Sequence, residues 1–217
     1  MGLKSKIIGG TLVASTAIAG LLYANNDVHP FKYNPLFDNS KFPTLGRENA
    51  ENVVIEIADF QCPYCAMASG LPEWVGEIRG NKEYGEFQST IDLAKKPREL
   101  AEKGEVKFIY APISALGKES TLSAEAVYCA RDQGKFWEMH DAIYSAHRGM
   151  GHDKGNFSTW ALEGIAAGIE GINSKEFDSC LESRRNFPKV KEATEIAIPL
   201  LNGGVPTLIV NGESVDF

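Results

Sequence analysis

The sequence predicts an α/β fold in which two strand-containing parts of the chain flank an inserted helical domain. Three observations predict it. A β-branched apolar run at residues 53–57 leads directly into a helical pattern, apolar residues alternate again at 106–110, and a third strand-like run with a hairpin signal stands at 207–212. Between the second and third runs, residues 117–199 have helical periodicity. The predicted sheet is therefore split by a helical insertion.

The most informative motif is Cys62-Pro63-Tyr64-Cys65, which follows the first predicted strand. Two cysteines separated by two residues at the start of a helix are typical of a thioredoxin-type redox motif. A helix N-terminus carries unpaired N–H groups and a partial positive charge, which lower a cysteine pKa from ~8.5 to roughly 3.5–7. Because the thiolate is the nucleophile, we expect Cys62 to attack disulfides.

The alternative for this cysteine pair is half of a zinc site. Such a site needs two further ligands, and the remaining cysteines, Cys129 and Cys180, stand singly in the sequence. The histidines have no spacing that suggests a metal site: they are His29, His140, His147 and His152. We expect His140 to pack at the edge of its helix and the His147/His152 loop to lie on the surface. The sequence therefore predicts no metal and no other cofactor.

The composition is that of a globular protein with a substantial core. The chain has 217 residues, of which 43% are hydrophobic and 24% charged. The formal net charge is −7, and no basic cluster stands outside the extreme N-terminus. Nucleic acid is therefore not an expected partner.

The N-terminus has the pattern of an export signal. Lys4 and Lys6 precede residues 7–23, which contain no charge. An apolar segment of about 17 residues is at the lower limit for crossing a bilayer. Residues 1–24 are therefore predicted to be a signal peptide or an N-terminal membrane anchor, with a buried core helix as the alternative. Prolines among polar residues at 25–50 predict a linker to the folded body.

The folded body is predicted in three parts. Residues 51–116 contain a strand at about 52–58, a helix from the CPYC motif to about 78, a polar connection over 79–104 and a strand at 106–110 that Pro112 ends. Because helices separate these two strands, we expect them to be parallel.

The second part, residues 117–199, is the helical insertion, in which Asn173 and Glu176 predict a capping pair. The third part, residues 200–217, returns to a strand pattern, and Asn211-Gly212 is a strong hairpin signal.

Four segments of this body resemble the bacterial DsbA-like thiol-disulfide oxidoreductases, a branch of the thioredoxin superfamily. They are ADFQCPYC at 58–65, YCA through QGKFW to HD at 128–141, FDSCL at 177–181, and GVPT followed by VNG at 204–212. Their order agrees with the family, and together they cover most of residues 51–217. The resemblance implies a thioredoxin-like fold split by an inserted helical domain.

The resemblance also implies roles for the site residues. Cys62 is the exposed attacking thiol, Cys65 releases the substrate from the mixed disulfide, and Pro63 and Tyr64 tune the pair without adding charge. The resemblance further implies a cis Pro206, with the Val205 backbone pairing to an extended substrate. The alternative for Pro206 is an ordinary proline at the entry of a strand.

Glu56 interrupts the first apolar strand six residues before Cys62. If buried without a partner, its pKa is raised and it can exchange a proton with Cys65; the family carries a glutamate at this place. The alternative is a partly wet position on the strand.

Some relatives carry a second disulfide, which predicts a structural bridge between Cys129 and Cys180, with two free buried thiols as the alternative. Relatives also continue past the hairpin into a further helix, so residues 200–217 are expected to be a truncated second part of the fold.

These observations predict an exported monomeric enzyme that introduces disulfides into unfolded or folding exported polypeptides. Its place would be the bacterial periplasm or the exterior of the cell envelope. By family resemblance, a membrane protein of the DsbB or VKOR kind would reoxidise it. Two alternatives stay open: a disulfide reductase or isomerase with the same site, and a non-enzymatic thiol protein that binds metal.

Overall fold

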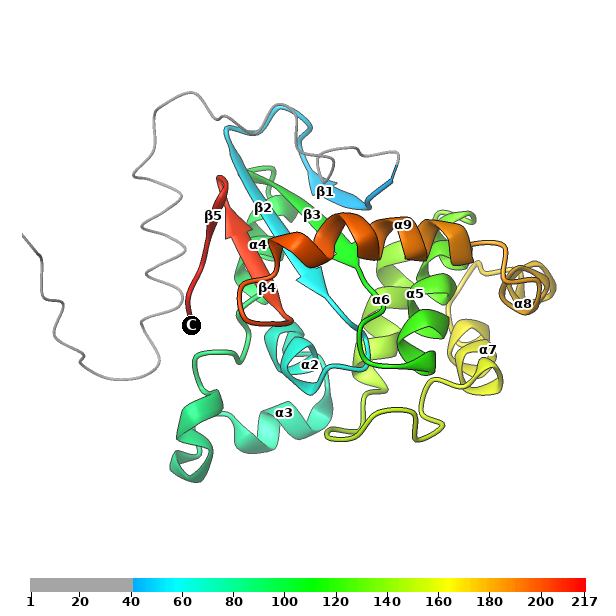
Figure 1. Ribbon diagram of the computed structural model, residues 1–217, viewed down its shortest axis with the longest axis horizontal. Helices are drawn as coiled ribbons and strands as arrows, with labels where there is room; N and C mark the ends of the chain where they lie inside the picture. The colour runs from blue at the N-terminus through cyan, green and yellow to red at the C-terminus, as the bar shows by residue number, and fades with distance from the viewer. Residues whose placement is uncertain (1–40) are drawn as a thin grey trace, which may run out of the picture.

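The computed structural model describes residues 41–217, which fold around a five-stranded mixed sheet of order β1-β3-β2-β4-β5 (Figure 1). The strands are β1 (Thr44–Gly46), β2 (Asn52–Ala58), β3 (Val106–Pro112), β4 (Thr207–Val210) and β5 (Glu213–Ser214). The central pair, β2 and β3, is parallel, which confirms the sequence prediction; β1, β4 and β5 pair antiparallel with their neighbours.

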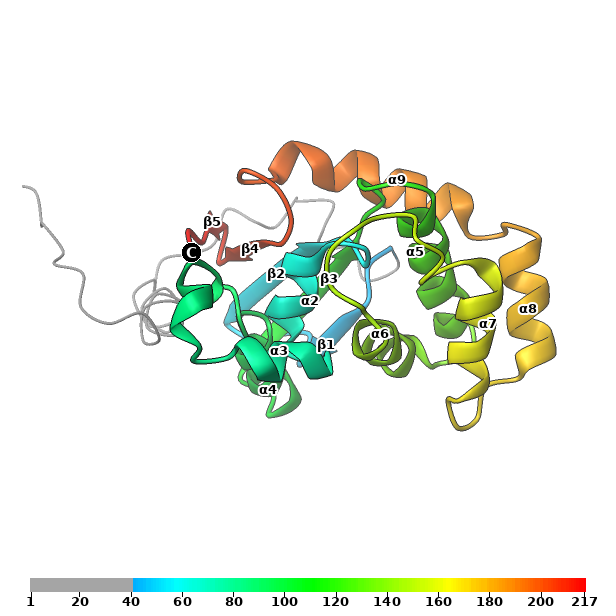
Figure 2. The ribbon, with the colours of Figure 1, turned by 90° about the horizontal axis from the view of Figure 1, so that it is seen from below.

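Helices cover both faces of this sheet (Figure 2). They are α2 (Pro63–Ser69), α3 (Glu73–Ile78), α4 (Lys95–Glu102), α5 (Lys118–Arg131), α6 (Phe136–Ser145), α7 (Thr159–Ala167), α8 (Ser174–Glu182) and α9 (Phe187–Ala197), with short 3-10 segments η3 (Lys82–Phe87) and η4 (Ile198–Leu200). Helix α9 lies on one face, whereas α2, α4 and α6 lie on the other.

The alternation of side chains along the strands creates two cores. On one face, Ile55, Ile57 and Ile109 pack with Ala193 and Ala197 of α9. Side chains on the opposite face of the sheet belong to the larger core, in which they pack against α2 and against the helices that follow β3. Helix α9, predicted as part of the 117–199 insertion, packs against α5 through Val190 and also covers the sheet. Its small alanines allow this close approach.

Two local features differ from the sequence prediction. Strand β1 lies within the expected linker at 25–50, where it pairs with β3 from Thr44↔Ile109 onward. Three residues are too few to show alternation, so only the long-range pairing reveals the strand. The helix predicted from the CPYC motif to 78 is two helices. Gly70, with φ of +68°, ends α2, and Pro72 precedes α3.

The helical insertion is fastened by caps and by a disulfide. The Asn173 side chain accepts a hydrogen bond from the Glu176 N–H at the start of α8, so the predicted capping pair is confirmed on the Asn173 side. A disulfide joins Cys129 on α5 to Cys180 on α8, and their Cα atoms are 5.8 Å apart.

The predicted signal peptide or anchor over residues 1–24 lies outside the described residues. Within residues 41–217, none of the helices combines the length and the apolar character that crossing a bilayer requires.

Candidate active site

The chain enters the candidate site through a tight turn between β2 and α2. The Asp59 carboxylate, which is fully buried, accepts hydrogen bonds from the N–H groups of Gln61 (2.9 Å), Ala115 (2.8 Å) and Leu116 (3.2 Å), and from the Ser120 hydroxyl (2.7 Å). Burial raises the pKa of Asp59, while these hydrogen bonds oppose the shift. This carboxylate fixes the loop that delivers Cys62 to the start of α2.

Cys62 is the N-cap residue of α2, and Pro63 occupies the first turn, where its missing N–H is not needed. The pKa of Cys62 is lowered, chiefly by a hydrogen bond from the Cys65 thiol and also by the N–H groups of Cys65 and Tyr64; burial and the Asp59 charge oppose this. The Cys65 thiol and the N–H groups at the helix start therefore favour the thiolate at Cys62.

Cys62 is buried, whereas the resemblance implies an exposed attacking thiol. Its relative exposure is only 4%. The loop between α9 and β4 covers it, and the Cys62 Sγ lies 3.3 Å from the Val205 carbonyl oxygen, to which the thiol donates. Because a thiolate cannot donate, ionisation of Cys62 releases this contact. The same carbonyl is then available to another chain that approaches the sulfur.

Cys65 has the opposite electrostatic character. It is fully buried in the larger core, and both sulfur atoms belong to free cysteines. Burial raises the pKa of Cys65 well above its usual value, and the hydrogen bond and charge of Cys62 and the charge of Glu56 add to this. The pair therefore has one sulfur that is stabilised as a thiolate and one that is stabilised as a thiol.

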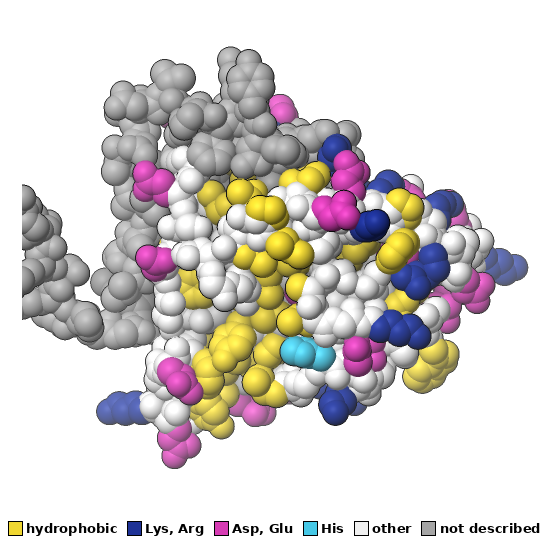
Figure 3. Space-filling view, viewed as in Figure 1, with side chains coloured by type: hydrophobic (Ala, Val, Ile, Leu, Met, Phe, Trp, Pro, Cys, Tyr) yellow, Lys and Arg dark blue, Asp and Glu magenta, His cyan; other side chains and the backbone are white. Residues whose placement is uncertain are grey.

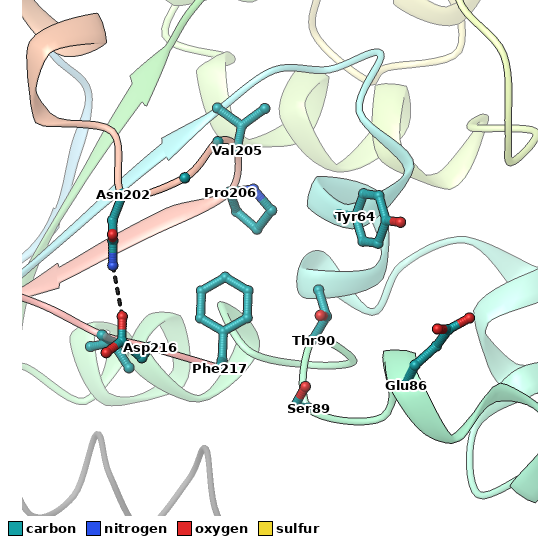
Figure 4. Close-up of a pocket in the computed structure, with 12 residues that line it drawn as sticks. Tyr64, Glu86, Ser89, Thr90, Asn202, Val205, Pro206, Asp216 and Phe217 are labelled. Carbon is teal, nitrogen blue, oxygen red and sulfur yellow. Dashed lines mark hydrogen bonds between the residues drawn. The ribbon is translucent and has the colours of Figure 1, made fainter.

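Pro206 follows a cis peptide bond from Val205, and both residues stand at the Cys62 side of the sheet. They line a groove of about 430 Å³ together with Tyr64, Thr90 and Phe217 (Figure 4). The complete lining is Tyr64, Glu86, Ser89, Thr90, Asn202, Gly203, Gly204, Val205, Pro206, Val215, Asp216 and Phe217. Figure 3 shows a band of apolar side chains that crosses this face of the molecule from the α9 region to the α2 region.

Glu56 lies beneath the cysteine pair at the centre of β2. Only 1% of it is exposed, so the partly wet alternative does not describe it. Burial raises its pKa from 4.5 to about 8, and the positive charge of Arg98 on α4 limits the rise. A carboxyl with a pKa near neutrality can both give and take a proton.

His147 is buried, whereas the sequence predicts that its loop lies on the surface. The ring is 5% exposed, and Nε2 lies 3.2 Å from the carbonyl oxygen of Gln61, which directly precedes Cys62. The Gly149 N–H donates to Nδ1 (3.0 Å), so Nδ1 is an acceptor and Nε2 carries the hydrogen that Gln61 accepts. Burial lowers the pKa of His147 and favours this neutral form.

The side chain of Gln61, which no sequence pattern marks, also binds the loop that contains Asp153. Its amide donates to Ser120 and Asp153 (both 3.1 Å) and accepts from the Asp153 N–H (2.6 Å). A glutamine beside a CxxC motif has no distinctive spacing, and its partner stands 92 positions later. Nothing in the linear pattern signals this contact.

Other residues selected from the sequence lie away from the sulfur pair. Cys129 and Cys180 are bonded to each other within the helical cluster. His140 is not at a helix edge but 1% exposed among the rings of Phe60, Tyr110 and Tyr144. In the described part of the chain, no group of three or more His, Cys, Asp or Glu side chains is arranged to hold a metal ion.

The family model for thioredoxin matches residues 86–217, more than half of the chain, and this match begins after the CPYC motif. The chain belongs to the thioredoxin family. Probable disulfide bond formation protein D of Bacillus anthracis is 27% identical over 212 residues, which cover 93% of this chain and 82% of that relative.

Solved structures of thioredoxin-like oxidoreductases have the same fold. BdbD of Bacillus subtilis in its oxidised form matches with a TM-score of 0.62 and 19% identity, over 83% of this chain and 86% of that one. Reduced DsbG of Mycobacterium tuberculosis matches with a TM-score of 0.57 and 20% identity, over 84% and 85%. These two likenesses establish the fold. The family match and the curated relative make the chain a protein disulfide oxidoreductase, and its fold is DsbA-like.

Proposed function

We propose that this oxidoreductase is exported and introduces disulfides into other exported polypeptides through Cys62 and Cys65. The observation that supports the oxidising direction best is the asymmetry of the pair. The pKa of Cys62 is lowered at the helix start, while burial holds Cys65 as a thiol. The lowered pKa of Cys62 stabilises the reduced enzyme, and a stabilised reduced form makes the corresponding disulfide a stronger oxidant; the raised pKa of Cys65 keeps the proton on the second sulfur.

The proposed reaction proceeds in two exchanges. A substrate thiolate attacks Cys62 Sγ, the Cys62–Cys65 bond breaks, and Cys65 leaves as a thiolate that takes a proton from Glu56. A second substrate thiolate then attacks the substrate sulfur of the mixed disulfide and releases Cys62 as a thiolate. Two electrons pass from the substrate to the enzyme, whose dithiol a membrane reoxidase of the DsbB or VKOR kind would oxidise again.

The groove beside Pro206 suits an extended polypeptide. Val205 offers a backbone carbonyl close to the attacking sulfur, and Tyr64, which is 39% exposed, offers an apolar surface on the other side. We propose that substrates lie along Val205 and Pro206 with a cysteine directed at Cys62. Export rests on the sequence alone, through Lys4, Lys6 and the uncharged segment 7–23.

A redox titration of the purified protein against glutathione tests the direction. The oxidase proposal predicts a potential above about −200 mV, whereas about −250 mV or lower contradicts it and favours a reductase with the same atoms. A Cys65→Ser variant tests the attacking role of Cys62, because its Cys62 thiolate should attack a disulfide-bonded peptide, expel one peptide thiolate and accumulate a mixed disulfide with the other half, which no Cys65 can resolve. A Cys62→Ser variant, as the matched control, should accumulate none.

A further inference from the structure

A partly buried polar cluster formed by Arg98, Asp141 and His140 is not used by the reaction described above. Arg98 on α4 pairs with Asp141 on α6 through two contacts, Nη1 to Oδ1 (2.7 Å) and Nη2 to Oδ2 (3.3 Å). The Arg98 guanidinium also lies over the Trp137 ring, 5.0 Å from its centroid. Asp141 in turn accepts from His140 Nδ1 at 2.7 Å. The Arg98 side chain is therefore held by two partners, Asp141 and the Trp137 ring, and is only 15% exposed.

Tyr110 neighbours both this cluster and Glu56. Tyr110 is the register partner of Glu56 on the neighbouring strand β3. The Tyr110 ring contacts Trp137 and His140 edge-on, with centroids at 6.1 and 4.7 Å, and its hydroxyl is 2.8 Å from that of Tyr144. The strand carboxyl and the Arg98 cluster thus face the same aromatic core.

Unpaired polar atoms gather at the same place. Within residues 41–217, five buried side-chain atoms have no hydrogen-bond partner, and three of them are Glu56 Oε1, Arg98 Nε and His140 Nε2. Buried polar atoms without partners cost free energy, so their concentration in one cluster suggests a functional role. His140 itself stays neutral, because burial lowers its pKa to about 4.

We propose that Arg98 is the positioning residue that sets the protonation of Glu56 beneath Cys65, held for that purpose by Asp141 and Trp137. The groups that interact electrostatically with Glu56 come from four elements: Cys65 on α2, Arg98 on α4, Tyr110 on β3 and Tyr144 on α6. Burial keeps the two tyrosines and Cys65 neutral by raising their pKa values. The strand on the other side, β4, places the apolar Leu208 opposite Glu56. Arg98 is therefore the full positive charge in this group.

The inference rests on the proposed proton exchange between Glu56 and Cys65, which requires a Glu56 carboxyl that titrates near neutrality. Burial alone would move its pKa far upward and keep the proton on the carboxyl. The Arg98 charge opposes burial and brings the value to about 8. Without Arg98, Glu56 would still donate a proton to Cys65 but would lose it again only at higher pH.

The test measures the titration of Glu56 directly in the intact protein by carbon-13 NMR of labelled glutamate side chains. The Glu56 signal is identified by its loss in Glu56→Gln. We expect a midpoint near 8 in the unchanged protein, and a midpoint higher by about 1 unit or more in Arg98→Met, since a nearby opposite charge lowers a carboxyl pKa by roughly 1–3 units. Arg98→Lys retains the positive charge, so its Glu56 midpoint should lie much closer to that of the unchanged protein than to that of Arg98→Met.

Arg184→Met is the matched control. It removes the arginine partner of another buried carboxylate, Glu125, whose Oε2 lies 2.6 Å from Arg184 Nε in a different part of the fold. We expect it to lower stability without moving the Glu56 midpoint. An unchanged midpoint in Arg98→Met, or equal shifts in Arg98→Met and Arg98→Lys, would overturn the proposal. If Arg98→Met does not fold, the Lys variant still decides, because a midpoint more than about 1 unit higher with the charge retained contradicts it.

A kinetic measurement separates this inference from the proposed function. The rate at which a thiol peptide opens the Cys62–Cys65 disulfide is measured against pH. Its midpoint should move to higher pH in Arg98→Met, but the same substitution should have no such effect in a Glu56→Gln background. A shift that persists without Glu56 means that Arg98 acts elsewhere and overturns the inference. If Glu56→Gln leaves the profile unchanged, the proton role of Glu56 fails, whereas the NMR titration still shows whether Arg98 sets its charge.

Discussion

At the scale of single residues, Glu56 carries a pH-dependent destabilisation that can be measured. Its pKa in the folded protein is about 8, above the ordinary value of 4.5. The folded state therefore binds this proton more tightly than the unfolded state. The stability due to the protonated carboxyl is complete below pH 4.5 and is lost as the pH rises through 8. A difference of this size corresponds to about 5 kcal/mol when the carboxyl is fully ionised.

Glu56→Gln removes this titration. We therefore expect the substitution to change the free energy of unfolding more favourably at pH 9 than at pH 5, by several kcal/mol. Urea unfolding of both proteins at the two pH values measures this. An equal effect of the substitution at pH 5 and pH 9 would show that Glu56 titrates normally in the folded protein.

His147 provides a second prediction at this scale. Replacement by Leu keeps an apolar side chain but leaves the Gln61 carbonyl and the Gly149 N–H without their partner. Such a loss costs ~1–3 kcal/mol. We expect His147→Leu to lower the free energy of unfolding by about this amount at pH 7.5, and to speed hydrogen exchange in residues 148–156. Unchanged exchange in this loop would mean that His147 does not fasten it.

At the scale of elements, Cys129 and Cys180 join α5 to α8 across a separation of 51 residues. In the chain-entropy model, closing a loop of this length restricts the unfolded chain by about 4 kcal/mol. A Cys129→Ala/Cys180→Ala protein should be less stable to urea by up to this amount and should still exchange thiols at Cys62. If thiol exchange is lost while stability is kept, the bridge belongs to the reaction rather than to the fold.

Elements with strong local patterns were predictable from the sequence, and those defined by distant contacts were not. Strand β2 is revealed by its apolar run, and the β4–β5 hairpin by Asn211 and Gly212. Strand β1 depends on pairing with β3, and the sheet-covering role of α9 depends on how the chain returns after α8. Periodicity reports that a helix has an apolar face but not which surface that face meets.

Some residues of the candidate site were likewise predictable from the sequence, and others were not. The CPYC motif and a glutamate within an apolar strand are visible in the linear sequence. The Arg98–Asp141 pair spans 43 positions, and the His147–Gln61 contact spans 86. No spacing rule relates such residues. The burial of Cys62 was missed for a similar reason, because the Val205 carbonyl that covers it comes from 143 positions away.

At the scale of the whole molecule, the direction of the reaction and the stability of the protein are coupled. Reduction of the Cys62–Cys65 bond allows the thiolate at the α2 start to form, and folding stabilises it. A thermodynamic cycle then requires the reduced protein to be more stable than the oxidised one if its disulfide is a strong oxidant, with each 30 mV corresponding to about 1.4 kcal/mol.

We expect reduction to increase the free energy of unfolding by several kcal/mol, on the scale of a potential difference of about 100 mV. The measurement is best made in the Cys129→Ala/Cys180→Ala protein, in which the active-site pair is the one disulfide that the described residues can form. Cys62→Ser serves as the control, because a reductant should not change its stability. If the oxidised protein is the more stable form, the same cycle requires a reducing potential, and the chain would then open disulfides in its substrates rather than introduce them.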